Sequence, residues 1–180
     1  MSAAVAYARR LAALHEELGI PHDYSLRRLL DVQPEVEASA LVTIGQTDAG
    51  RDCQLIESAA HAFRGMRARA REYDIELLPL SGFRSVERQV EIIRGKLALG
   101  EKIDVILNTM AAPGYSEHHT GRAIDIGISG EPPLEESFAE TKAFSWLERH
   151  GATFGFTMSF PKGNPHGFIY EPWHWCWRAR

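Results

Sequence analysis

Stretches with apolar residues at helical spacing are interspersed with short extended segments along this chain of 180 residues. Helices are predicted over residues 1–19, 54–73, 85–100 and 135–150. Strands are predicted over residues 41–45, 75–80, 117–119, 123–128 and 168–177. Helices therefore precede and interrupt a small, mostly antiparallel sheet, which predicts the α+β class with flanking helices.

The chain shows no internal repeat and no low-complexity linker. A length of 180 residues with 44% hydrophobic content suits one compact domain with a real core. We therefore predict a single domain over residues 1–180. Within it, residues 1–40 form a helical lead-in and residues 41–178 form the core that carries the function. The segments 101–115 and 157–168 are expected to be loops.

The charge balance bears on the partners of the protein. Twenty Lys and Arg residues against 24 Asp and Glu give a net charge of −4. Nucleic acids and anionic membrane surfaces reward clustered positive charge, so neither is expected as the main partner. No run reaches the roughly 18 apolar residues of a membrane span. Residues 1–19 also lack the apolar centre of a signal peptide, so the chain as written is expected in the cytoplasm.

The cysteine content limits the kinds of metal site that this chain could form. The two cysteines, Cys53 and Cys176, form no Cys-x-x-Cys pair and imply no disulfide framework. Any metal must therefore be held by histidine and carboxylate side chains. Eight histidines are available for this purpose.

The segment SEHHTGRAID at 116–125 offers two histidines and an aspartate. Two imidazoles and a carboxylate, with one position open for water, suit a catalytic zinc ion. Gly121 allows the chain to double back, so that both ends of the segment converge. Adjacent residues on a strand point to opposite faces. Only one of His118 and His119 is therefore expected to reach the metal, and the residues alone do not say which.

The segment YEPWHW at 170–175 can complete such a site. His174 would supply the missing ligand, and Glu171 is close enough in sequence to stand beside the bound water. Zinc lowers the pKa of bound water to about 7. A carboxylate just outside the ligands can accept the proton and pass it to a leaving amine. Pro172 argues against a regular helix at this point.

The segment SGFRS at 81–85 lies at a turn from a strand to a helix. The planar fork of Arg84 donates two parallel hydrogen bonds, which suits a carboxylate or a developing oxyanion. Gln89 projects from the first turns of the helix toward the same opening. Each of the three segments also has an ordinary structural explanation. These are a surface histidine pair, a hydrogen-bonded histidine in an aromatic core strand, and an arginine in a surface salt bridge.

Together, the segments resemble the LAS metallopeptidases. The pattern Ser-x-His-x-x-Gly-x-Ala-x-Asp, followed later by Glu-x-Trp-His, is similar to the carboxypeptidase branch of that group. This branch contains vancomycin-resistance D,D-carboxypeptidases and L,D-carboxypeptidases of peptidoglycan metabolism. The resemblance covers roughly residues 41–177. It implies a peptidase domain with the LAS fold, which is also that of hedgehog-type domains.

The resemblance also implies a set of metal ligands. His118, Asp125 and His174 match the positions that bind Zn²⁺ in the family. His119 falls on a variable position and is expected beside the site rather than on the metal. Cys176 is expected to be a buried core thiol, because the family uses no cysteine ligand.

The remaining site residues are assigned in the same way. Glu171 resembles the general base and acid of the family, and Arg84 the residue that steadies the oxyanion or the substrate carboxylate. Gln89 and Ser116 are similar to residues that hold the terminal carboxylate. One departure is that relatives often carry Arg directly after the second aromatic residue of the last motif, whereas here Cys176 and Trp177 come before Arg178.

The activity implied by the resemblance is removal of the C-terminal D-alanine from peptidoglycan stem peptides or muropeptides of bacteria. L,D cleavage of tetrapeptides is favoured over D,D cleavage of pentapeptides, because the chain as written has no leader and fits recycling in the cytoplasm. A leader preceding this sequence would instead place it in the periplasm or outside the cell. Two alternatives stay open: an L-alanyl-D-glutamate endopeptidase of the endolysin type, and a non-catalytic zinc-binding module.

Overall fold

The structure, a computed structural model, describes residues 2–47 and 50–179. The helices are α1 (Ala3–Leu18), α2 (Tyr24–Arg28), α3 (Glu57–Arg71), α4 (Val86–Ala98), α5 (Ile103–Thr109) and α6 (Lys142–His150). The strands are β1 (Leu41–Gln46), β2 (Asp52–Ile56), β3 (Leu78–Ser81), β4 (Ala123–Gly127), β5 (Phe156–Met158) and β6 (His174–Trp177). Short 3₁₀ helices are η1 (Ala38–Ala40), η2 (Glu117–Thr120), η3 (Glu136–Glu140) and η4 (Gly151–Phe154).

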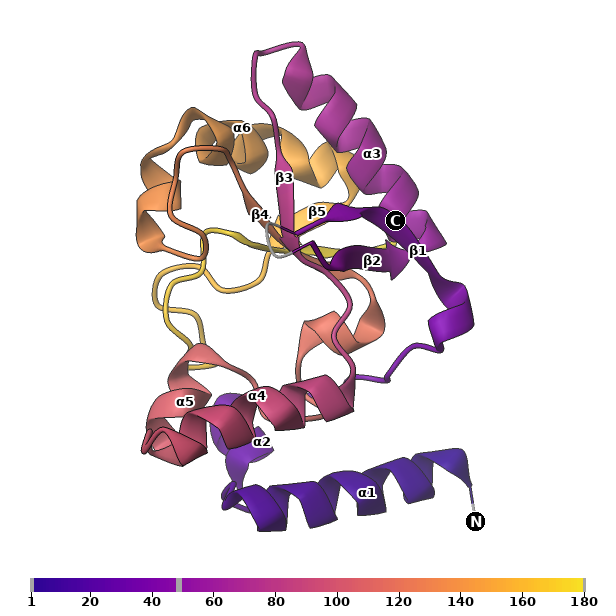
Figure 1. Ribbon diagram of the computed structural model, residues 1–180, viewed down its shortest axis with the longest axis vertical. Helices are drawn as coiled ribbons and strands as arrows, with labels where there is room; N and C mark the ends of the chain where they lie inside the picture. Colours follow the sequence, from indigo (N-terminus) through magenta and orange to yellow (C-terminus); the bar gives the residue numbers. More distant parts are fainter. Residues whose placement is uncertain (1, 48–49, 180) are drawn as a thin grey trace.

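The strands form two antiparallel sheets. β1 and β2 make a hairpin, and a four-stranded sheet follows the order β3-β4-β6-β5. Helices α3 and α6 accompany these sheets in the upper part of Figure 1. The mixed α+β architecture with small antiparallel sheets confirms the predicted fold class.

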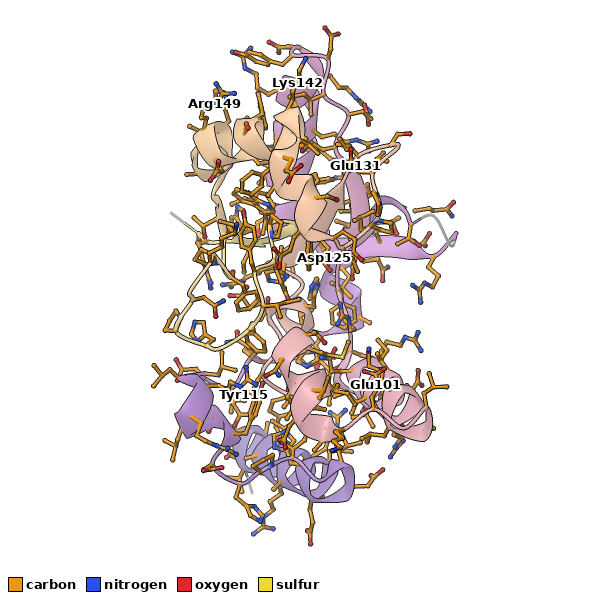
Figure 2. All side chains as sticks on the ribbon, turned by 90° about the vertical axis from the view of Figure 1, so that its left-hand side faces the viewer. Glu101, Tyr115, Asp125, Glu131, Lys142 and Arg149 are labelled. Carbon is orange, nitrogen blue, oxygen red and sulfur yellow. The ribbon has the colours of Figure 1, made fainter. Side chains whose placement is uncertain are left out.

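The molecule has two hydrophobic clusters, one in each half. The first joins the sheets to α3 and α6; α3 contributes the buried side chains Ala59, Ala60, Phe63, Met66 and Ala70. The second joins the lead-in to α4 and α5, where Leu18 and Tyr24 pack with Ile93 and Ile106. These helices form the lower part of Figure 1. Asp125 lies at mid-height between the two halves (Figure 2).

Three predicted elements differ from the observed ones. Residues 54–56 belong to strand β2 rather than to a helix, because they pair with β1 and bury Leu55; helix α3 begins at Glu57. Residues 117–119 form the 3₁₀ helix η2 instead of a strand. The helix expected over 135–150 is divided into η3 and α6, because the Thr141 side chain accepts a hydrogen bond from Phe144 N–H and starts a new helix.

The expected loops also contain regular structure. α5 lies within 101–115, and β5 lies at the start of the Pro- and Gly-rich segment after residue 155. The extended segment predicted over 168–177 is a strand only from His174 to Trp177. The N-terminal helix, expected over 1–19, is observed as α1, while residue 1 lies outside the described residues. No helix of the described ranges is long and apolar enough to cross a membrane.

Candidate metal centre

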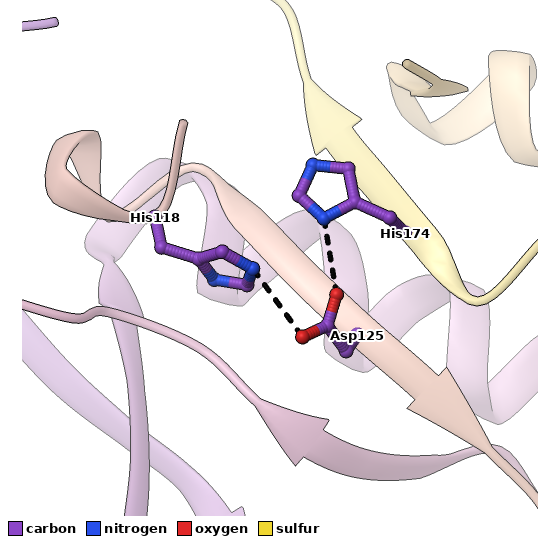
Figure 3. Close-up of side chains that lie close together, drawn as sticks. All are labelled: His118, Asp125 and His174. Atoms are coloured by element: carbon purple, nitrogen blue, oxygen red, sulfur yellow. Dashed lines mark hydrogen bonds and ion pairs between the residues drawn. The ribbon is translucent and has the colours of Figure 1, made fainter. Parts of the chain in front are cut away.

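Strand pairing brings two of the predicted ligands together. β4 lies between β3 and β6, and Asp125 is directly opposite His174 in the antiparallel register. Directly opposed residues have Cβ atoms about 4.5–5.5 Å apart, so their side chains can meet. The Asp125 carboxylate lies 3.0 Å from His174 Nδ1 (Figure 3).

The third predicted ligand arrives from η2. The Ser116 hydroxyl caps this short helix by accepting from His118 N–H, and Gly121 ends it with a φ of 64°. This left-handed conformation favours glycine and turns the chain directly into β4. As a result, His118 Nε2 lies 3.3 Å from the other oxygen of Asp125 (Figure 3).

The tautomer of His118 follows from its second contact. Its Nδ1 lies 2.6 Å from the backbone carbonyl of Gly82, which can only accept a hydrogen bond. Nδ1 therefore carries the proton, and the Nε2 lone pair points into the site. A backbone carbonyl that orients a metal-binding imidazole in this way is common in metal sites.

These three side chains fit a zinc ion. One ligand atom from each of His118, Asp125 and His174 lies within 4.8 Å of the others, and all three residues are buried. Two imidazoles and one carboxylate are a donor set typical of catalytic zinc, with a fourth position left open. The pKa of Asp125 lies well below its usual range. Burial raises this pKa, but the interactions with His118 and His174 lower it by more than burial raises it.

Glu117 is a site residue that the sequence reasoning missed. Its carboxylate lies 3.0 Å from His174 Nε2, on the side of the ring away from Asp125. It also accepts hydrogen bonds from Ser159 Oγ at 2.5 Å and Arg178 Nη2 at 2.6 Å. Burial raises the pKa of Glu117, but these partners outweigh it and hold that pKa at about 2.

His174 is thus placed between two carboxylates. Burial lowers its pKa, but hydrogen bonds with Asp125 and Glu117 raise it to about 10. Binding of a metal at Nδ1 requires that nitrogen to lose its proton, while Nε2–H can keep its bond to Glu117. Arg178, which is separated from the last motif by Cys176 and Trp177, reaches the site through Glu117. Apart from its position between Ser116 and His118, no sequence pattern pointed to Glu117.

Glu171 stands next to the predicted ligands. Its carboxylate lies 4.0 Å from His174 Nδ1, and the residue is only 9% exposed. Burial raises its pKa to about 7; His174 and Arg84 act in the opposite direction, and Asp125 adds to the rise. Residues 171–174 form a turn in which His174 N–H donates to the Glu171 carbonyl. Pro172 in this turn agrees with the absence of a regular helix.

Arg84 is held on several sides. Its guanidinium donates to Gln89 Oε1 at 3.0 Å and to Ser81 Oγ at 3.3 Å, and it lies 4.0 Å from Asp125. Gln89 is fully buried and uses its amide nitrogen to donate to the Ala111 carbonyl at 2.6 Å. Both polar atoms of Gln89 are therefore engaged, and in this arrangement it orients Arg84.

A cavity of about 370 Å³ contains these groups. It is lined by all seven predicted site residues: Arg84, Gln89, Ser116, His118, Asp125, Glu171 and His174. Apolar side chains, among them Phe160, Phe168 and Trp173, complete its wall. A larger hollow of about 590 Å³ beside α6 is lined by none of the predicted site residues.

His119 points away from the ligands and is fully buried. Its Nδ1 donates to the Arg84 carbonyl at 2.6 Å, and its Nε2 accepts from Gly114 N–H at 3.1 Å. His119 therefore connects the backbone of Arg84 to the segment before η2. Cys176 is buried, as expected, and burial raises the pKa of its thiol to about 12.

The chain is similar to known carboxypeptidases. The family model described as VanY, D-alanyl-D-alanine carboxypeptidase, matches residues 52–180. The chain is 32% identical to YodJ of Bacillus subtilis (strain 168) over 168 residues, which cover 91% of this chain and 58% of YodJ. The chain thus spans less than two thirds of that relative's length.

Two solved structures are also similar. The LD-carboxypeptidase LdcB shares 30% sequence identity with a TM-score of 0.72; the match covers 83% of this chain and 74% of LdcB. A mutant of the D,D-pentapeptidase VanY from a VanB-type vancomycin-resistance cassette, in complex with Zn(II), shares 25% identity with a TM-score of 0.62. That match covers 83% of this chain and 86% of VanY.

Proposed function

Because this chain belongs to the VanY family of D-alanyl-D-alanine carboxypeptidases, we propose that it is a zinc carboxypeptidase of peptidoglycan stem peptides. The observation that carries the proposal is one cavity that holds His118, Asp125 and His174 with Glu171 and Arg84 beside them. A non-catalytic zinc module would need neither of the last two residues.

The residues divide the chemistry of peptide hydrolysis between them. A zinc ion held by His118, Asp125 and His174 would supply Lewis acidity and lower the pKa of water. Glu171 takes the proton from the attacking water as its oxygen adds to the carbonyl carbon. It then gives that proton to the nitrogen of the departing D-alanine as the C–N bond breaks. Its carboxylate lines the cavity and lies 4.0 Å from His174 Nδ1, the nitrogen that would bind the metal.

Recognition of the peptide terminus falls to Arg84 and Ser116. Arg84 is 18% exposed on the cavity and held by Gln89, so its fork is oriented before the substrate arrives. Ser116 Oγ accepts from His118 N–H, and its hydroxyl proton is available to a substrate oxygen. Gln89 contributes to recognition of the terminus through its hydrogen bond with Arg84.

Within this function we propose L,D cleavage of tetrapeptides ahead of D,D cleavage of pentapeptides. The support is sequence identity, which is 30% with the LD-carboxypeptidase LdcB and 27% with the L,D-carboxypeptidase DacB, against 25% with the zinc-bound VanY. The TM-scores, 0.72, 0.59 and 0.62 in the same order, do not separate the two activities. Incubating the zinc-loaded protein with purified tetrapeptide and pentapeptide muropeptides, followed by mass spectrometry, tests the choice. Loss of alanine from the tetrapeptide is expected. Loss from the pentapeptide alone would assign D,D activity instead.

Amidation of the substrate C-terminus should strongly reduce cleavage. The charged terminus is what distinguishes the last peptide bond from earlier ones, and an amide leaves Arg84 without its anionic partner. Losing a hydrogen bond to a charged group costs about 1.5–3 kcal/mol, or roughly ten- to a hundredfold in kcat/KM. The measurement compares a stem peptide ending in D-Ala with the same peptide amidated. Equal cleavage of both would refute the carboxypeptidase and favour the endopeptidase.

Replacing Glu117 with glutamine should lower the affinity for zinc more than it lowers kcat of the zinc-loaded protein. The amide keeps the size of the side chain but loses the charge that orients His174 through Nε2. Groups that hold a metal-binding histidine in this way typically contribute about 10–100-fold in affinity. Competition with a chelator measures the change, and Glu148→Gln, on the exposed side of α6, serves as the control. Zinc affinity equal to that of the control would exclude this role for Glu117.

A further inference from the structure

The N-terminal segment, residues 2–36, lies against the loops around the cavity. It precedes the region matched by the family model, which begins at residue 52. Its polar contacts with the backbone of residues 112–114 are Tyr24 Oη to Ala112 N (3.1 Å), His15 Nε2 to Pro113 O (2.8 Å) and Gln33 N to Gly114 O (2.8 Å). The segment therefore supports the chain just before η2 and the metal centre.

Arg28, at the end of α2, makes the contact that reaches the other side of the cavity. Its Nη1 donates to the carbonyls of His166 at 3.1 Å and Gly167 at 2.6 Å. Its Nη2 donates to Asn108 Oδ1 at 2.8 Å. The guanidinium also lies 5.2 Å from the ring centre of Phe168. One side chain thus joins α2 both to α5 and to the loop over residues 159–169.

The backbone of Arg28 strengthens the same junction. His166 Nδ1 lies 2.9 Å from the Arg28 carbonyl, which can only accept, so the imidazole donates back to α2. Ile169 N–H donates to the Asn108 carbonyl at 3.1 Å, which joins the loop to α5 directly. No ion pair of Arg28 occurs among the residues that the structure describes. Its fork is satisfied by neutral oxygens whose positions it fixes.

The parts that Arg28 joins form the cavity wall. The loop supplies Phe160, Phe168 and Ile169, and the end of α5 supplies Thr109. The ring of Phe160 lies 4.8 Å from that of His174 between centroids, so the loop also touches the metal centre. A shift of this loop would therefore change the shape of the space in which a peptide sits.

We propose that Arg28 is a positioning residue that sets the substrate-facing wall of the cavity, so that the N-terminal segment is part of the working peptidase. The proposal rests on the carboxypeptidase function for its substrate. Lysine cannot replace arginine here, because a single ammonium cannot reproduce a planar fork that reaches three oxygens on two elements.

Arg27 provides a matched control. It precedes Arg28 on the same short helix and is also cationic, but its side chain is 58% exposed and pairs with Asp23 at 2.8 Å. Among the described residues its side chain has no hydrogen bond or ion pair with the loop or with α5, so removing it deletes a charge and the ion pair with Asp23 alone. Comparison with Arg27→Ala therefore distinguishes an effect on the cavity wall from a general effect on α2.

The test measures kcat and KM of the zinc-loaded full chain on a stem tetrapeptide. Small misplacements of a binding site can cost up to about a hundredfold, so Arg28→Ala should lower kcat/KM roughly ten- to a hundredfold, mainly through KM. Arg28→Lys should shift it in the same direction, and Arg27→Ala should stay within about twofold. Zinc content should be equal in all of them. If Arg28→Ala does not fold, Arg28→Lys carries the comparison.

Hydrogen exchange gives a second readout that does not depend on turnover. Amides of residues 160–169 should exchange faster in Arg28→Ala than in Arg27→Ala, while those of β4 and β6 stay protected. A kcat/KM and a loop exchange equal to those of Arg27→Ala would overturn the proposal. If the wild-type chain cleaves no stem peptide, the carboxypeptidase function fails, and the exchange measurement still decides whether Arg28 holds the wall.

Discussion

Replacing His118 with alanine is expected to remove both zinc binding and peptide cleavage. His118 supplies one of two imidazoles in a centre with a single carboxylate, and the remaining pair of ligands is too few for a catalytic zinc site. Its Nδ1 bond to the Gly82 carbonyl holds the ring so that Nε2 faces Asp125. Metal analysis of the purified variant should find essentially no zinc, and activity on stem peptides should fall to background.

His119→Ala is the matched control for this variant. His119 lies next in the sequence but points to the Arg84 carbonyl and to Gly114 N–H, away from the ligands. The variant should keep most of its zinc. It should also be less stable, because two buried backbone groups lose their partner at about 1–3 kcal/mol each. Zinc lost from His119→Ala and kept in His118→Ala would mean that the ligand assignment is wrong.

Glu171→Gln is expected to keep zinc and lose turnover. The amide preserves the size of the side chain and can still form hydrogen bonds, but it cannot accept the proton of the attacking water. General acid–base catalysis contributes at least about a hundredfold, so kcat should fall by that factor or more. Zinc content and melting temperature should match the wild type. Turnover near the wild-type rate would remove Glu171 from the mechanism.

Glu117→Gln provides an informative contrast, because Glu117 and Glu171 approach His174 from different sides. Glu171 lies near Nδ1, the nitrogen that faces Asp125, whereas Glu117 lies at Nε2. Loss of the first should appear in kcat at saturating zinc. Loss of Glu117 should lower the affinity for zinc, and added zinc should largely restore the activity. The same pattern in both variants would contradict the division of roles.

Local sequence patterns predicted the fold class. The resemblance to the LAS metallopeptidases implied seven site residues, and all seven line one cavity. The residues alone left His118 and His119 as alternatives, and the resemblance selected His118. The structure places His118 beside Asp125 and His119 against the Arg84 carbonyl, although η2 is not a strand. The limit appears where local patterns are ambiguous. Gln54 and Leu55 fit a helix as well as a strand, and only their pairing with β1 decides for the strand.

Long-range contacts could not be predicted in this way. Glu117 acts on His174, 57 residues further along the chain, and Arg28 reaches Gly167 across 139 residues. Neither pair has a sequence pattern, because each depends on how separate loops meet in space. The contacts of Gln89 could not be predicted either. Its position predicted a substrate contact, whereas the structure shows that it hydrogen-bonds to Arg84 and Ala111.

The register of β4 against β6 has a consequence for how the protein matures. A slip of one residue would turn Asp125 to the opposite face of the sheet and separate it from His174. A zinc ion that needs both residues can bind only molecules whose strands are correctly paired. It would favour them by about 4 kcal/mol at a concentration a thousandfold above its Kd. Zinc binding would then select the molecules with correctly paired strands. The supply of zinc during synthesis would therefore influence the yield of correctly folded protein.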